Sequence, residues 1–266
     1  MPVYQKTLPH FPWADPKLAR LPGVQPMVEI GDFLRRDEAF AGQMALRDDL
    51  IAHQLEDVHA VLPQALLAAQ ELYDIVLQRL SQDESYEIGP AQITRPDGVV
   101  VKLDRSKPLI TLGRLVQEDL CILQPQDGEH HLTGAILCFP ASWTLAEKLG
   151  RAMLAIHHPV ESYSVDIATR VQRMLDVMRP TQGLWRMNYL TYAVPDLHHP
   201  LREATPRDRS VNIPKPYARC ERQCFIKLPQ TGAVVFTIHT YLMPIVYLPP
   251  EVRAGLEQVT QRLDRA

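Results

Sequence analysis

The chain has 266 residues, of which 46% are hydrophobic and 22% are charged, and its formal net charge is -3. This composition is typical of a folded globular protein with a sizeable core. A slightly negative chain offers no basic field for nucleic acid, and no apolar run reaches the roughly 18 residues of a membrane span. We therefore expect neither nucleic acid nor a membrane among its partners.

The four cysteines are the next constraint on function. Their spacing fits no zinc or iron–sulfur motif, and no apolar signal segment opens the sequence. We expect free thiols and a cytoplasmic location, because disulfides are rare in a reducing compartment. The cysteines are Cys121, Cys138, Cys220 and Cys224.

The N-terminal third reads as an arm followed by helices. Residues 1–32 are rich in proline and aromatics without a sustained period, which favours an extended arm with a short helical turn near 16–21. Apolar spacing then predicts a helical extension over residues 33–82, with two helices separated near Pro63.

Beyond residue 83 the pattern becomes mainly that of strands. Alternation predicts strands over 86–93, 99–103, 120–124 and 132–139, then two helices, then strands over 184–193, 218–228 and 233–241. This order favours an α+β fold over residues 83–250, in which a PAS-like antiparallel sheet lies against a helical wall. A C-terminal helix is expected over 251–266.

The stretch between the two groups of strands carries the first candidate ligand. Thr144 can cap a helix with Glu147 three residues later, and Pro159 disfavours helical geometry at the residue before it. Leu145, Leu149, Met153 and Ile156 share one helical face, so His157 ends an apolar stripe. Such an imidazole suits an axial ligand of heme iron, and it equally suits a core histidine with satisfied ring nitrogens.

Strand parity sorts the polar residues near the C-terminus. Arg222 shares one face with Cys220 and Cys224, whereas Glu221 and Gln223 share the other. On the preceding strand, Arg186 and Asn188 lie on one side together. An arginine and an amide beside an iron could donate hydrogen bonds to dioxygen or a carboxylate. The same residues could instead form cross-strand ion pairs on a solvated face.

Four segments in this order resemble the heme-dependent oxidative N-demethylase alpha-subunit family over roughly residues 30–245. They read F-P-A-S-W-T-L-A-E-K-L-G, I-H-H-P-V, W-R-M-N-Y and R-C-E-R-Q-C-F-I-K-L-P-Q-T-G-A-V-V-F-T-I-H-T-Y. The resemblance implies a heme-binding PAS fold that uses dioxygen to remove a methyl group from a small secondary amine. It also implies a reductase partner, with NADPH, FMN and a 2Fe-2S cluster carried by other subunits.

The same resemblance assigns roles to individual residues. His157 would bind the iron of heme b, Arg222 and Glu221 would be catalytic, with Arg222 in the distal pocket, and the cofactor would also contact Arg186, Asn188 and Gln223. The chain departs from the family pattern where it has Glu161, Tyr189 and His239, three positions expected near that pocket.

Three functions follow from these expectations. The first is an enzyme, an oxidoreductase that converts a small amine to an aldehyde and a shorter amine. The second is a heme-based gas or redox sensor without turnover, and the third is a heme-free binding protein. A second contact to the iron site from His53, His59 or His239 stays open.

Overall fold

The computed structural model describes residues 3–19, 22–157, 165–205 and 214–263. Its centre is a seven-stranded sheet with the order β1-β8-β9-β10-β6-β7-β2, in which every neighbouring pair is antiparallel. The strands are β1 (Gln25–Pro26), β2 (His59–Val61), β6 (Asp119–Gln126), β7 (Glu129–Ile136), β8 (Leu184–Tyr192), β9 (Tyr217–Lys227) and β10 (Val234–Pro244). The five long strands of this sheet are β6 and β7, which precede α6, α7 and α8 in the chain, and β8, β9 and β10, which follow them. Their alternation predicts all five.

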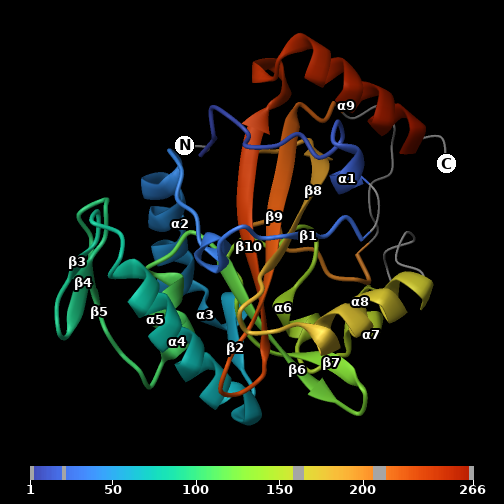
Figure 1. Ribbon diagram of the computed structural model, residues 1–266. Helices are drawn as coiled ribbons and strands as arrows, with labels where there is room; N and C mark the ends of the chain where they lie inside the picture. The colour runs from blue at the N-terminus through green and yellow to red at the C-terminus, as the bar shows by residue number, and fades with distance from the viewer. Residues whose placement is uncertain (1–2, 20–21, 158–164, 206–213, 264–266) are drawn as a thin grey trace.

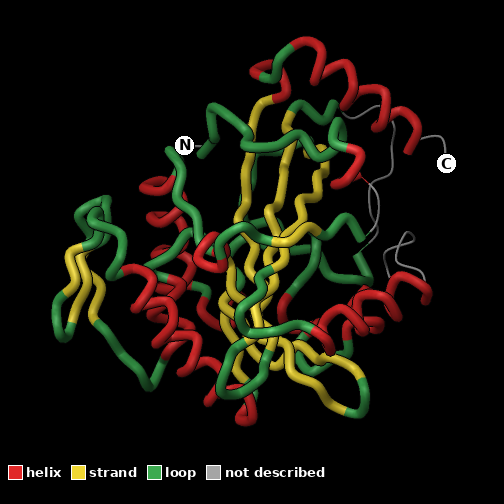
Figure 2. Tube along the Cα trace, in the orientation of Figure 1, coloured by secondary structure: helices red, strands yellow, loops and turns green. Residues whose placement is uncertain are grey.

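Helices cover both sides of the sheet and one of its ends (Figures 1 and 2). They are α1 (Pro16–Ala19), α2 (Phe40–His53), α3 (Leu55–Val58), α4 (Leu66–Leu80), α5 (Pro108–Gly113), α6 (Leu145–Lys148), α7 (Met153–His157), α8 (Val165–Val177) and α9 (Pro250–Leu263). In Figure 1, α2, α4 and α5 lie on one side of the sheet, whereas α7 and α8 lie on the other. The mixed architecture confirms the predicted α+β class. No described helix is long and apolar enough to cross a bilayer.

The first two predicted strands, over 86–93 and 99–103, form a hairpin that does not join the large sheet. The strands β3 (Glu87–Ile88), β4 (Gln92–Thr94) and β5 (Val100–Lys102) form a separate three-stranded sheet, which projects at the edge of the molecule in Figure 1. The expected placement of this hairpin in the PAS-like sheet is therefore wrong. Alternation identifies a strand, but the partner of that strand depends on long-range packing.

The expected helix from residue 144 onwards is broken. It consists of α6 and α7, and Gly150 between them has φ 78°, a left-handed conformation that ends a helix. The Gly150 amide donates to Leu132 O at 2.7 Å, so the connection pairs with β7 instead of continuing the helix. Thr144 makes no backbone cap. Its hydroxyl donates to the Glu147 carboxylate at 2.6 Å.

One apolar core joins the N-terminal helices to the sheet. Met44 of α2 and Leu72 of α4 are fully buried in the same cluster as Ile226 of β9 and Val235 of β10. Burial of this kind supplies most of the stability of a helix in a protein. Residues 33–82 are thus packed onto the sheet, and they support the strands that carry the candidate site.

Candidate functional site

The register of β8, β9 and β10 separates the predicted site residues onto two faces of the sheet. Asn188 pairs with Glu221, and Arg186 pairs with Gln223. Because side chains opposite each other in a sheet lie on the same face, these four residues share one face. We call it the α8 face. It carries Phe225 as well, and α7 and α8 cover part of it.

Glu221 is the centre of a small polar cluster on the α8 face. Its side chain is buried, and its Oε2 atom accepts hydrogen bonds from Gln223 Nε2 at 3.0 Å and Asn188 Nδ2 at 3.4 Å. Arg219, two residues earlier on the same face, places Nε 3.5 Å from Oε1. Gln223, Asn188 and Arg186 are half-buried. The cluster therefore combines one buried carboxylate with donors that fix its orientation.

Helix α7 covers the same face as this cluster. Met153 and Ile156 pack in one apolar cluster with Phe225 and Ile238. Phe225 follows Gln223 by two positions on β9, and Ile238 pairs directly with Gln223 from β10. The helix that ends at His157 thus belongs to the same apolar cluster as the neighbours of Gln223, and its main contacts are with β7 and α8. The His157 side chain itself lies outside the described residues, as does Glu161.

Arg222 points to the opposite face, which we call the arm face because the N-terminal arm covers it. It is 2% exposed, and its Nη1 donates to Asp32 O at 2.7 Å and to Cys224 Sγ at 2.9 Å. Its guanidinium lies 5.3 Å from the centre of the Trp185 ring. Arg222 and Glu221 therefore do not line one pocket, although they are adjacent in the sequence.

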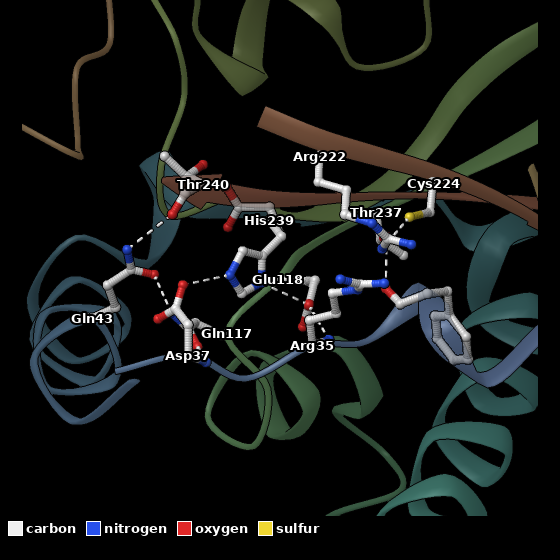
Figure 3. A network of polar contacts seen from close by, with 12 residues as sticks. Arg35, Asp37, Gln43, Gln117, Glu118, Arg222, Cys224, Thr237, His239 and Thr240 are labelled. Carbon is white, nitrogen blue, oxygen red and sulfur yellow. Dashed lines mark hydrogen bonds and ion pairs between the residues drawn. The ribbon is translucent and has the colours of Figure 1, made fainter. Parts of the chain in front are cut away.

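A second polar network lies on the arm face (Figure 3). The two ring nitrogens of His239 contact two carboxylates, with Nε2 3.0 Å from Asp37 Oδ2 and Nδ1 2.9 Å from Glu118 Oε1. Gln117 donates to Asp37 Oδ1 at 2.8 Å, and Gln43 donates to Thr240 O at 3.0 Å. The network joins β10 to two other segments, the one that leads into α2 and the one that leads into β6.

Burial and hydrogen bonding act in opposite directions on these groups. Burial by itself lowers the pKa of His239, but the hydrogen bonds and charges of Asp37 and Glu118 raise the pKa to about 9. Burial raises the pKa of Asp37, yet the protonated His239 and the amide donors bring its pKa below the usual value. An imidazolium held between two carboxylates accounts for both directions.

Sequence reasoning did not identify Asp37 and Glu118. No local pattern connects these two residues with His239, from which they are separated by 202 and 121 positions. Two positions that depart from the family pattern, Tyr189 and His239, also lie on the arm face, since they pair with Cys220 and Arg222. Neither belongs to the cluster around Glu221.

The other histidines considered as second ligands lie elsewhere. His53 is exposed at the end of α2 and contacts Asp49 at 3.1 Å. His59 is half-buried in β2, and burial lowers its pKa. Among the described residues, no group of three or more histidine, cysteine or acidic side chains is arranged to hold a metal ion.

A surface pocket of about 220 Å³ lies between α7 and α8. Met153, Leu154 and Val165 give it an apolar lining, and Gln172 and Arg173 give it a polar side. Its volume suits a small molecule and is below that of a typical cofactor site.

The protein is therefore of the α+β class, with a carboxylate–amide cluster on the sheet face that α7 and α8 partly cover. Comparison with family models identifies the group. Residues 23–265 match the model described as "Haem-dependent oxidative N-demethylase, alpha subunit-like". This is nearly the whole chain, and the protein belongs to that family.

Proposed function

We propose that this chain is the heme-binding subunit of an oxidative N-demethylase that removes a methyl group from a small secondary amine, using dioxygen. The observation that carries the proposal is that α7, which ends at His157, shares one apolar cluster with Phe225 and Ile238, on the sheet face that also carries Glu221. Family membership supports the heme dependence and the class of reaction.

The residues of the α8 face fit a heme group chemically. Phe225, Ile238 and Ile156 belong to one apolar cluster on this face, which would suit a macrocycle, and His157 would supply an imidazole to hold the iron. Arg186, Asn188 and Gln223 lie half-buried on the same face, where their donors would contact the group or its bound ligands. Bound heme would supply the oxidising chemistry, and the protein would supply binding and orientation.

Glu221 is our candidate for holding the substrate. A small alkylamine is an ammonium ion at neutral pH, and a buried carboxylate is a suitable partner for such an ion. The amides of Asn188 and Gln223 both donate to Oε2, so they fix the plane of the carboxylate. This leaves Oε1 directed towards Arg219 and available for one further donor.

The resemblance places Arg222 in the distal heme pocket, but we propose a structural role for it. It is buried on the arm face and holds the Asp32 carbonyl, so we propose that it positions the segment leading into α2. Donors for a ligand on the α8 face would come from Arg186, Asn188 and Gln223 instead.

Electrons would come from a reductase partner. The family description names an alpha subunit, and we propose that partner subunits carry the FMN, the 2Fe-2S cluster and the NADPH site. The overall reaction would consume one N-methylated amine, one O2, two electrons and two protons. It would give the demethylated amine, formaldehyde and water. The four buried cysteines are unpaired, which fits a reducing compartment such as the cytoplasm.

Hemin titration of the purified protein tests the proposal. We expect a Soret band that saturates at one heme per chain in the wild type and in His53→Ala, an exposed-histidine control. His157→Ala should lose this band. The loaded protein, supplied with electrons, should then release formaldehyde from a small methylamine.

Two results would contradict the proposal in different ways. A wild-type protein that takes up no hemin would leave a heme-free binding protein. A protein that binds heme and dioxygen but oxidises no methylamine would favour a sensor.

A further inference from the structure

The last turn of α7 is held by cations that the proposed function does not use. Lys148 is only 4% exposed, and its ammonium group donates to Ile156 O at 2.6 Å. Arg151 donates through Nη2 to Ala155 O at 2.9 Å. The carbonyls at the end of a helix have no partners within it, and a cation there also complements the helix dipole.

The hydrogen bond from Lys148 is made to the peptide group that joins Ile156 to His157. The Ile156 carbonyl belongs to the peptide group whose nitrogen is that of His157. Peptide groups are planar, so a fixed carbonyl also fixes the direction in which the chain enters His157. Arg151 fixes the preceding peptide group in the same way.

An acidic residue from a distant loop completes the arrangement. Glu203 forms ion pairs with Lys148 and, at 3.1 Å, with Arg151. Its backbone amide donates to Glu147 at 3.1 Å, and the Glu147 carbonyl accepts from Arg151 at 3.1 Å. Because burying an unpaired ammonium group is costly, Glu203 is what allows Lys148 to lie inside the protein.

The start of α7 is fixed as well. Arg151 O accepts from the Leu132 amide at 3.1 Å, and Ala152 forms an antiparallel bridge with His131 of β7. The short helix is therefore anchored to the sheet edge at one end and to the cation pair at the other. A five-residue helix has little stability of its own, so these contacts decide its position.

We propose that Lys148, with Arg151 and Glu203, is a positioning residue that sets the orientation of His157 for heme binding. The heme part of this inference rests on the proposed function, whereas the immobilisation of residues 151–157 does not. Lys148 acts through the Ile156 peptide and touches no substrate.

Lys148→Met keeps the length of the apolar stem and removes the charge and its donors. In the apoprotein we expect the backbone amides of residues 151–157 to exchange hydrogen about tenfold faster or more, with exchange in α8 unchanged. In the hemin titration we expect about tenfold weaker binding and an altered midpoint potential. Lys148→Arg should restore much of each property, because it retains a buried cation.

Lys102→Met, in the exposed strand β5, is the matched control and should behave as the wild type. If Lys148→Met does not fold, Glu203→Gln provides the same test, because it removes the carboxylate charge from a partly exposed position. Wild-type exchange rates and hemin affinity in the folded variant would overturn the inference.

The two proposals fail in distinguishable ways. If His157→Ala binds hemin as the wild type does, the proposed function fails, while the exchange rates still report whether Lys148 immobilises residues 151–157. If His157→Ala loses hemin but Lys148→Met does not differ from the wild type, the axial ligand stands and the positioning role is lost.

Discussion

His239 Nδ1 lies 2.9 Å from Glu118 Oε1, and each side chain is only 1% exposed to solvent. The histidine contacts Asp37 through its other nitrogen, so one imidazolium joins two segments that are far apart in the sequence.

The pKa of His239 is raised to about 9 in the folded protein, above the ordinary value of 6.5. The folded state therefore holds its proton more tightly, and this contribution to the free energy of unfolding is complete below pH 6.5 and is lost as pH rises through about 9. We expect urea unfolding to show a loss on the order of 3 kcal/mol across this range. His239→Gln should be less stable at pH 6, with a flatter profile. Equal slopes for the two proteins would contradict this role.

Asp119, the first residue of β6, holds the segment that leaves β7 and leads to α6. It is fully buried, pairs with Arg47 at 2.6 Å and accepts the backbone amides of Cys138 at 2.7 Å and Phe139 at 2.9 Å. Asp119→Ala leaves a buried guanidinium without its carboxylate, so we expect a loss of about 3–5 kcal/mol in urea unfolding. The double variant with Arg47→Met should lose less than the two single losses combined. Additive losses would contradict the coupling.

Gly150 and Gly255 form a matched pair for backbone effects. Gly150 has φ 78°, and an added Cβ would meet only Leu62, at 3.9 Å. Gly150→Ala should therefore lose about 1 kcal/mol through backbone strain alone. Gly255 lies inside α9 with ordinary helical geometry and room for a methyl group, so Gly255→Ala should gain up to about 1 kcal/mol. Thermal melting of both variants shows whether each stability change has the expected sign. A Gly150→Ala variant as stable as the wild type would argue against the break between α6 and α7.

Glu221→Gln tests the proposed substrate contact. The change retains the shape of the side chain but removes the charge that would attract an ammonium group. We expect the KM for a small methylamine to rise about tenfold or more, because a charged hydrogen bond is lost, while hemin binding stays as in the wild type. Glu87→Gln, in the exposed strand β3, is the control. An unchanged KM would exclude Glu221 as the ammonium partner.

Local patterns predicted much of the fold. Alternation over residues 184–193, 218–228 and 233–241 predicted β8, β9 and β10 with bounds close to those observed, and apolar spacing predicted α8. Parity also predicted correctly that Glu221 and Gln223 lie on one face and Arg222 on the other. These features depend on periods of a few residues, which a sequence shows directly.

Other features depend on partners that are distant in the chain. The sequence did not indicate that the hairpin near residue 97 forms a sheet of its own, that Gly150 interrupts the helix, or that Lys148 reaches the Ile156 carbonyl. The last two follow from pairing with β7 and from Glu203, 55 positions away.

The sequence by itself determined the α+β class, the faces of the last three strands and the family, because each is encoded by local periodicity or by ordered motifs. Only the tertiary structure decided which residues share a site. It brought Glu221, Asn188 and Gln223 together on one face of the sheet and placed Arg222 against the arm on the other. The physical reason is that hydrogen bonding between strands and burial of long-range contacts, rather than proximity in the sequence, determine which side chains meet.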